Sequence, residues 1–361
     1  MTDTVVVDAR MLAYPMTGIG RYALELLTQL VGDGEQEWVL LSSAPVPAGV
    51  RDRLRGNVGW VEGDGQGRAE YWTQRTSRRE LQRRPGAAYL GLANSLPFLG
   101  PRAARYWLVV YDLSFVAIPY LTDRQDLVKG YLVTLPAILK ADRLLAISPS
   151  IEAQLHRWFP WTRRRTAALP PGGTKLVTRP EPLPFERRSG FLMVGAHRRK
   201  NGGLLLDAYA ALAPETRARH PLFVIARSIP EMIGRRARAL GVERNLRLCP
   251  DASDAELERL YGECLALVYP SVYEGLGLPV AEALLAGLPA IVPGESPMTR
   301  FLGGGGIVVW PLRVPALAAA MERLATDARA WRACSVAARD AGRAIGWEQV
   351  GEAARRALGL E

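Results

Sequence analysis

Short runs rich in apolar and β-branched residues alternate with helix-length segments along the whole chain, and they form two series. The first series has runs at residues 5–7, 38–41, 106–111 and 143–147. The second series has runs at residues 191–194, 222–226, 246–248, 265–269, 290–292 and 307–310. Such alternation is typical of parallel sheets covered by helices. It predicts an α/β fold made of two doubly wound domains in tandem.

The boundary between the two domains is expected where Pro and Gly are dense. The chain of 361 residues is long enough for two cores, each of about 150 to 180 residues. Residues 169–173 and 179–184 have the composition of a linker. We therefore predict an N-terminal domain at residues 1–180 and a second domain at residues 181–340.

Charge and cysteine content restrict partners and compartment. The net charge is +10, and residues 68–105 hold eight arginines against Glu70 and Glu80. Such a cluster either contacts anionic lipid or nucleic acid, or is simply a solvated face. No nucleic-acid-reading motif accompanies it, so we expect peripheral membrane contact and no nucleic acid. Three cysteines without a C-x-x-C pair, and no basic leader at the N-terminus, favour reducing cytoplasm.

The segment from Tyr269 to Leu284 reads Tyr-Pro-Ser-Val-Tyr-Glu-Gly-Leu-Gly-Leu-Pro-Val-Ala-Glu-Ala-Leu. It follows an apolar run and predicts a strand, a glycine loop and a helix from Pro279 to Ala286, stopped by Gly287. Glycines let backbone N–H groups approach a ligand, and a helix N-terminus favours an anion such as a diphosphate.

Two carboxylates of this segment, Glu274 and Glu282, stand eight residues apart. We place Glu274 at the opening of the loop and Glu282 in the first helical turn, where they bracket a ligand instead of touching each other. Carboxylates accept hydrogen bonds from vicinal hydroxyls, as on a ribose or a hexose. The alternative is that Glu282 caps the helix and Glu274 is exposed.

The same segment resembles the Glu-x7-Glu signature of retaining glycosyltransferases of family 4, which have the GT-B fold of two Rossmann-like domains facing a central cleft. Three further segments resemble that family in the same order. They are Val7–Arg10 with Thr17–Tyr22, then Val194–Asn201, and finally Trp347 with the helix after it. The resemblance implies that residues 341–361 form a helix crossing back to the first domain.

The resemblance also implies roles for individual residues. Glu282 would bind ribose hydroxyls, and Lys200 with Arg199 would neutralise the diphosphate, unless these cations belong to a solvated loop. Gly18 and Gly20 would face the donor phosphates or the acceptor. The transferred sugar would be held by Glu274 and by the backbone of Gly275, Leu276, Gly277 and Leu278. No Asp-x-Asp motif is present, so no metal is expected.

Two segments depart from the family pattern. Tyr111-Asp112 stands where many relatives carry His-Asp, and a tyrosine cannot act as a cation near neutral pH. Asp112 is then a candidate polar residue on the acceptor side, or else it caps the strand end. Glu295 is near, but not at, the position of an acid that relatives often carry near the nucleotide, so the base cannot be read.

The implied activity is transfer of a hexose, with mannose preferred, from a nucleoside diphosphate sugar to a saccharide acceptor with retention of configuration. GDP-mannose is the preferred donor, a UDP-sugar is the second choice, and no further cofactor is expected. The acceptor would be lipid-linked, which implies work at the inner face of the cytoplasmic membrane. Alternatives are a nucleotide-sugar epimerase on the same fold, or a catalytically silent subunit of a polysaccharide-assembly complex.

Overall fold

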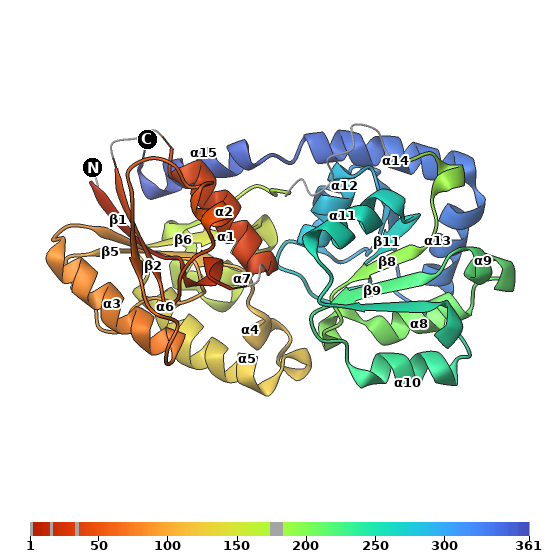
Figure 1. Ribbon diagram of the computed structural model, residues 1–361, viewed down its shortest axis with the longest axis horizontal. Helices are drawn as coiled ribbons and strands as arrows, with labels where there is room; N and C mark the ends of the chain where they lie inside the picture. The colour runs from red at the N-terminus through yellow and green to blue at the C-terminus, as the bar shows by residue number, and fades with distance from the viewer. Residues whose placement is uncertain (1–2, 15–16, 33–35, 174–182, 361) are drawn as a thin grey trace. The chain divides into compact units, whose positions relative to one another are not determined.

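The chain forms two compact units (Figure 1). The computed structural model describes residues 3–14, 17–32, 36–173 and 183–360. One unit comprises residues 1–172 together with 347–361, and the other comprises residues 173–346. The boundary predicted at residues 180 and 181 lies outside the described residues.

The first unit is built on a seven-stranded parallel sheet in the order β3-β2-β1-β4-β5-β6-β7. Its strands are β1 Thr4–Asp8, β2 Glu37–Ser42, β3 Val58–Glu62, β4 Ala88–Gly91, β5 Arg105–Val110, β6 Arg143–Ala146 and β7 Thr166–Ala168. Val6 of β1 pairs with Val39 on one side and with Tyr89 on the other. Val6 is fully buried, as expected of a central parallel strand covered on both faces.

Three of these strands, β3, β4 and β7, were not predicted. β3 lies at the edge of the sheet, is partly exposed and contains Gly59, so it lacks a buried apolar run. β4 and β7 are four and three residues long and contain no Val or Ile. Their pairing comes from neighbouring strands and not from their own propensity.

Helices and short turns connect the strands of the first unit. The α-helices are α1 Gly18–Leu30, α2 Ala48–Arg51, α3 Ala69–Arg83, α4 Ser114–Ala117, α5 Arg124–Lys129, α6 Leu135–Lys140, α7 Pro149–Trp158 and α15 Trp347–Leu358. A π-helical turn at Gly130–Thr134 joins α5 to α6. Helix α15 packs on α1, where Arg355 donates a hydrogen bond of 2.8 Å to the carbonyl of Gln29.

The second unit has a six-stranded parallel sheet in the order β10-β9-β8-β11-β12-β13, and every strand was predicted. The strands are β8 Phe191–Val194, β9 Leu222–Ala226, β10 Leu246–Pro250, β11 Ala266–Val268, β12 Ala290–Pro293 and β13 Gly306–Val309. The helices are α8 Gly202–Ala210, α9 Pro214–Arg219, α10 Glu231–Ala239, α11 Asp254–Glu263, α12 Leu278–Leu285, α13 Val314–Thr326 and α14 Ala328–Arg343. The prediction of two doubly wound α/β domains is confirmed.

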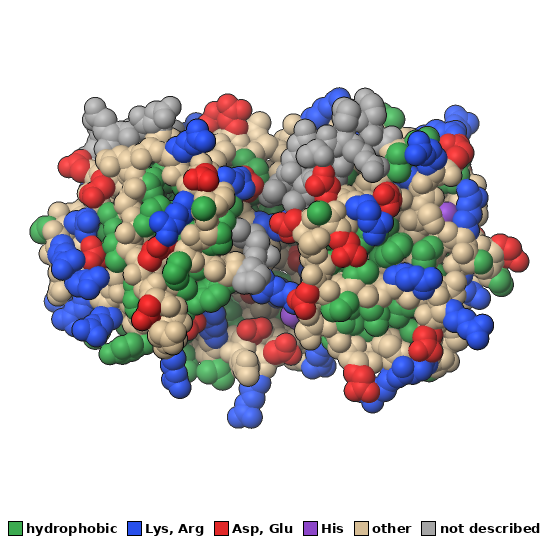
Figure 2. Space-filling model, in the orientation of Figure 1, with side chains coloured by type: hydrophobic (Ala, Val, Ile, Leu, Met, Phe, Trp, Pro, Cys, Tyr) green, Lys and Arg blue, Asp and Glu red, His purple; other side chains and the backbone are tan. Residues whose placement is uncertain are grey.

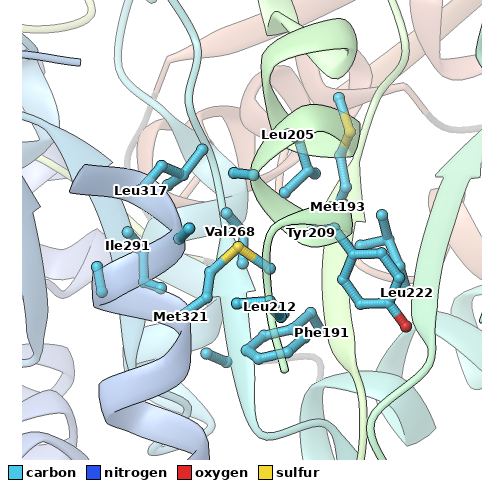
Figure 3. Close-up of a cluster of buried hydrophobic side chains, with 14 of the residues drawn as sticks. Phe191, Met193, Leu205, Tyr209, Leu212, Leu222, Val268, Ile291, Leu317 and Met321 are labelled. Atoms are coloured by element: carbon cyan, nitrogen blue, oxygen red, sulfur yellow. The ribbon is translucent and has the colours of Figure 1, made fainter. Parts of the chain in front are cut away.

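Apolar cores cover both faces of the second sheet. On one face, Phe191 and Val268 belong to a cluster that includes Met321 of α13 (Figure 3). On the other face, Leu267 and Tyr269 join the cluster that contains α12. Residues 266–269 thus alternate between the two cores with the strand period of two. The alternation places Tyr269, which follows the last residue of β11, on the same face of the sheet as α12.

The topology also places the functional edge. In the second sheet, β8 and β11 are neighbours although they are far apart in sequence, so the strand order reverses there. Ligands of open α/β sheets bind outside the carboxyl ends of strands at such a switch point.

No helix among the described residues is long and apolar enough to span a membrane. In the same part of the chain, no group of three or more His, Cys, Asp or Glu is placed to hold a metal ion.

Candidate functional site

The glycine loop after β11 leads directly into α12, as predicted. Gly277 has a φ of 92°, and a Cβ atom there would lie 2.5 Å from Cγ of Met298, so the position requires glycine. The helix begins at Leu278, one residue earlier than predicted, because the left-handed Gly277 already turns the chain. Glu282 is therefore the fifth helical residue and lies beyond the first turn, which corrects the prediction.

A second loop, after β8, packs against the first. Gly195 has a φ of 86°, and the Cε atom of Lys200 lies 3.1 Å from where its Cβ would be. The Arg199 carbonyl accepts hydrogen bonds from the Val272 N–H at 2.9 Å and from the Ser271 hydroxyl at 3.1 Å. These backbone contacts hold the two loops at the ends of β8 and β11 together.

Lys200 and Glu274 form a buried ion pair where the loops meet. The Nζ atom of Lys200 lies 2.6 Å from Oε1 of Glu274, and it also donates to the Tyr269 hydroxyl. The same Oε1 accepts a hydrogen bond of 2.6 Å from the Ser271 hydroxyl. Lys200 Nζ lies 4.4 Å from the centroid of the Tyr269 ring. Tyr269, which contacts the ammonium, and Ser271, which donates to the carboxylate, therefore hold the ion pair in one arrangement.

The electrostatics keep this pair charged. Burial by itself raises the pKa of Glu274, but the charges of Lys200 and Arg199 outweigh it, together with the hydrogen bonds from Lys200 and Ser271. The net pKa shift is downward, so Glu274 is ionised at neutral pH. Burial and the nearby Glu274 raise the pKa of Tyr269 well above its usual range, so that hydroxyl stays protonated.

Glu282 has a different partner. Its Oε2 atom accepts a hydrogen bond of 2.8 Å from the hydroxyl of Tyr261, which comes from α11, and both side chains are buried. Glu274 is buried too, so the alternative with an exposed Glu274 and a capping Glu282 is wrong. The two carboxylates therefore bind different groups, Glu282 the Tyr261 hydroxyl and Glu274 the Lys200 ammonium and the Ser271 hydroxyl.

No role was predicted from the sequence for Tyr261, Tyr269 or Ser271. Tyr261 follows Leu260 on α11 and has the apolar spacing of a core residue, while Tyr269 and Ser271 lie within the motif without an evident partner. The tyrosines themselves could have indicated a role, because they stand where an aliphatic residue would fill the core and a buried hydroxyl needs a hydrogen-bond partner.

The remaining predicted residues lie in the first unit. Gly18 and Gly20 form part of the first turn of α1, and the Thr17 hydroxyl accepts a hydrogen bond of 3.1 Å from the Gly20 N–H. That amide is therefore already occupied by a cap. Asp112 accepts hydrogen bonds from the backbone N–H and the hydroxyl of Ser114, at 3.2 and 2.9 Å, where α4 begins.

Tyr111 belongs to an aromatic cluster. Its ring centroid lies 5.6 Å from that of Tyr22, which lies 4.9 Å from that of Trp347. Within the described part of the chain, the Tyr22 and Tyr111 hydroxyls and the Trp347 indole N–H are buried without a hydrogen-bond partner. Burial raises the pKa of Tyr111 well above its usual range, so Tyr111 carries no charge near neutral pH.

Comparison with known proteins agrees with this architecture. Residues 188–327 match the family described as glycosyl transferases group 1. O-antigen chain mannosyltransferase B of Escherichia coli is 29% identical over 355 residues, which cover 90% of this chain and 91% of that protein. The GDP-mannose:cellobiosyl-diphosphopolyprenol alpha-mannosyltransferase of Komagataeibacter xylinus is 42% identical over 77 residues, or 21% of this chain and 20% of that protein.

A solved structure shows the same fold over both units. WaaG, a glycosyltransferase involved in lipopolysaccharide biosynthesis, matches with a TM-score of 0.75 at 17% identity, over 99% of this chain and 100% of that one. At this identity the likeness speaks for the fold alone. Taken together, the comparisons show that the chain has the GT-B fold and that residues 188–327 of its second unit match the group 1 glycosyltransferases.

Proposed function

We propose that this chain transfers mannose from GDP-mannose to a hydroxyl of a saccharide acceptor, with retention of configuration. The observation that carries the proposal is the buried Lys200–Glu274 pair beside the glycine loop and α12. The choice of mannose is supported by the names of the two relatives, a mannosyltransferase of O-antigen chains and one that uses GDP-mannose.

The diphosphate of the donor would lie at the N-terminal end of α12, near Lys200 and Arg199. The leaving nucleoside diphosphate gains negative charge in the transition state, and fixed cations with a helix N-terminus stabilise that charge. An ammonium has three N–H donors, so Lys200 can hold Glu274 and a phosphate oxygen at once. We propose that these groups act without a metal or another cofactor.

The two carboxylates would then divide the donor between them. Glu274, kept ionised by its neighbours, would accept hydrogen bonds from the transferred sugar, with the backbone from Gly275 to Leu278 alongside. Glu282 has one oxygen on Tyr261, which orients the carboxylate toward ribose hydroxyls. Retention is proposed through front-face attack, assisted by the leaving phosphate.

The acceptor is proposed to be a lipid-linked saccharide, reached at the inner face of the cytoplasmic membrane. The relative from Komagataeibacter xylinus is named for an acceptor joined to polyprenol through a diphosphate, which supports this class of acceptor. Nucleic acid has no part in the proposal.

The test is a calorimetric titration of the full chain with GDP-mannose, UDP-glucose and ADP-glucose. Charged hydrogen bonds contribute about 1.5 to 3 kcal/mol each, so Glu282→Ala should weaken GDP-mannose binding by about ten-fold to more than a hundred-fold. Glu215→Ala, which removes an exposed acid of α9 in the same unit, is the matched control and should bind as the parent does. Unchanged affinity in Glu282→Ala for every nucleotide sugar contradicts the assignment.

A product analysis then separates transfer from the alternatives. Mass spectrometry of reactions with and without a polyprenyl-diphosphate saccharide should show a mannosylated acceptor only when acceptor is present. An isomerised sugar formed without acceptor would indicate an epimerase. Binding without any turnover would indicate a silent subunit.

A further inference from the structure

The chain leads into β8 through residues 183–190, and this entry segment is bonded to the turn between α11 and β11. We call that turn, residues 261–265, the α11–β11 corner. The Leu265 N–H donates a hydrogen bond of 2.7 Å to the Gly190 carbonyl, directly before the paired strands β8 and β11 begin. The entry segment and the corner are therefore held together by the backbone.

Arg188 adds a side-chain connection between the same two segments. Figure 2 shows other Lys and Arg side chains spread over the visible surface, whereas Arg188 is only 2% exposed. Its Nη1 atom donates to the carbonyls of Cys264 at 2.9 Å and Tyr261 at 3.4 Å, and its Nε atom donates to the Leu183 carbonyl at 3.1 Å. Its Cζ atom lies 5.2 Å from the centroid of the Trp331 ring. One guanidinium thus binds three carbonyls and an aromatic face.

The chemistry of these partners explains why a cation stands at a buried position. Burying a charge is unfavourable unless polar partners replace water. The last carbonyls of a helix have no partner within the helix and carry partial negative charge, and an indole face also attracts a cation. Tyr261 lies in the last turn of α11 and Cys264 follows that helix directly. A methionine could fill the same space but would leave these carbonyls unbound, so the charge of Arg188 holds the end of α11 in place.

Tyr261 connects the α11–β11 corner to the carboxylate of Glu282. The Tyr261 carbonyl accepts the hydrogen bond from Arg188, and the fully buried Tyr261 hydroxyl donates one of 2.8 Å to Oε2 of Glu282. A displacement of the end of α11 therefore displaces the hydroxyl. Hydrogen bonds weaken steeply when their geometry is poor, so the orientation of Glu282 depends on the position of the helix end.

We propose that Arg188 is a positioning residue for nucleotide-sugar binding, which acts through Tyr261 on Glu282. The inference rests on the proposed function, because that function assigns the donor's ribose hydroxyls to Glu282. An arginine suits this role better than a lysine, since its planar fork donates in several fixed directions, whereas a lysine ammonium is a point charge on a flexible stem. Arg188→Lys therefore keeps the charge and loses the geometry.

Calorimetric titration of the full chain with GDP-mannose, together with initial rates of mannose transfer, tests the inference. Arg188→Lys should weaken affinity about two-fold to ten-fold with kcat nearly unchanged, because it weakens one hydrogen bond that orients a binding group. The double variant Arg188→Lys, Tyr261→Phe should bind no more weakly than Tyr261→Phe alone, because the bond through which Arg188 acts is already missing. A merely structural role of Arg188 would add its own loss in that background.

Arg217 provides the matched control in the same unit. Its guanidinium donates to the carbonyl of Ala210 at 2.7 Å and to that of Leu212, so it binds the end of α8 as Arg188 binds the end of α11. Arg217→Lys makes the same chemical change at a helix end that does not carry Tyr261. It should bind GDP-mannose as the parent does.

A second variant disturbs the α11–β11 corner without changing a charge. The Trp331 indole N–H donates a hydrogen bond of 2.7 Å to the Leu265 carbonyl, and its ring faces Arg188. Trp331→Phe removes this N–H and keeps an aromatic ring. It should weaken GDP-mannose binding about two-fold, and it too should have no further effect when Tyr261 is already phenylalanine.

Three results would each overturn the inference. They are unchanged affinity in both Arg188→Lys and Trp331→Phe, a loss in the double variant equal to the product of the single losses, and an equal loss in Arg217→Lys. Any of them in a parent that binds GDP-mannose leaves the proposed function standing. A parent that binds no nucleotide sugar refutes the proposed function itself, and with it the inference.

Discussion

Each unit buries a carboxylate near the carboxyl end of a central strand, and the two carboxylates behave in opposite ways. In the first unit, Asp8 ends β1, and both Arg10 and Ser95 lie 3.4 Å from its oxygens. In the second unit, Glu274 has its two partners at 2.6 Å. Burial dominates at Asp8 and raises its pKa, although Arg10 opposes the shift, whereas cations and hydrogen bonds prevail at Glu274 and lower its pKa.

The opposite pKa shifts show which of the two buried carboxylates stays ionised and is available to a ligand. Topology alone is the same on both sides, so it cannot separate a site from a scaffold. Short, charge-assisted hydrogen bonds maintain an ionised pair in the second unit, and such pairs are roughly twice as strong as neutral ones. In the first unit, the Arg10 Nε atom lies 3.4 Å from Asp8, and burial outweighs the charge of Arg10. Variants that break this contrast test the account.

The largest effect is expected from Lys200→Ala. Removing one well-placed electrostatic donor costs about 10² to 10³ in rate, and Glu274 loses its principal counter-charge. Initial rates of mannose transfer measure this loss, with Lys129→Ala as an exposed lysine control that should keep the parent rate. Because an uncompensated buried carboxylate destabilises a fold, the double variant Lys200→Ala, Glu274→Gln should also be slow while remaining folded. A fast double variant would contradict the role of Lys200.

A smaller effect is expected from Tyr261→Phe, which removes the hydroxyl that orients Glu282. A hydrogen bond of this kind contributes about 0.5 to 1.5 kcal/mol, so KM for GDP-mannose should rise about two-fold to ten-fold with kcat nearly unchanged. Tyr209→Phe is the matched control, since its hydroxyl bonds the His220 carbonyl at 2.9 Å, away from Glu282. If both variants shift KM equally, the effect is structural and Tyr261 does not position Glu282.

The two carboxylates also predict opposite pH dependence of stability. The folded pKa of Glu274 lies below its ordinary value near 4.5, so its contribution is present above that value and is lost as pH falls through the folded pKa. The folded pKa of Asp8 lies above its ordinary value near 3.8, so its contribution is present below that value and is lost as pH rises through the folded pKa.

Urea unfolding between about pH 3 and pH 7, read by hydrogen exchange in peptides of each unit, measures these contributions separately. Glu274→Gln should remove part of the rise in stability with pH in the second unit. Asp8→Asn should remove a fall in the first unit. The same sign of pH dependence for both residues would contradict the comparison.

The smallest effect is expected from Tyr111→Phe. Among the residues that the structure describes, its buried hydroxyl has no hydrogen-bond partner. An unsatisfied buried hydroxyl is unfavourable, so its removal should stabilise the first unit by up to about 1 kcal/mol. Tyr89→Phe is the contrasting variant, because the Tyr89 hydroxyl accepts a hydrogen bond of 3.0 Å from Ser77, and its loss should destabilise by about 1 kcal/mol. A marked destabilisation by Tyr111→Phe would show that the hydroxyl has a partner.

The sequence allowed prediction of the parts of the fold that depend on local pattern. All six strands of the second sheet have short apolar runs in the sequence, and those of β8, β9, β11 and β12 are largely buried. Gly277 supplies the left-handed conformation at the start of α12. What could not be predicted depends on partners distant in the chain. Tyr261 reaches Glu282 across 21 residues, and Lys200 reaches Glu274 across 74 residues, so only packing shows that they meet.

In the first unit, too, the local sequence did not predict features that depend on neighbouring strands. Its edge strand β3 and the short β4 and β7 lack a periodic signal, and they become strands because neighbours offer hydrogen bonds. Gly18 and Gly20 were predicted near a ligand from a resemblance, whereas locally they start a helix capped by Thr17. Whether they contact phosphate stays a prediction.

The most direct test of the central claim compares mannose transfer against pH for the parent chain, Lys200→Ala and Tyr111→Phe. If the charge that acts on the donor lies in the second unit, the parent rate is nearly flat around a histidine pKa of about 6.5. Tyr111→Phe then keeps most of the rate, and Lys200→Ala loses about 10² to 10³ of it. A Tyr111→Phe chain as slow as Lys200→Ala would contradict the account, because it would place an essential catalytic group in the first unit.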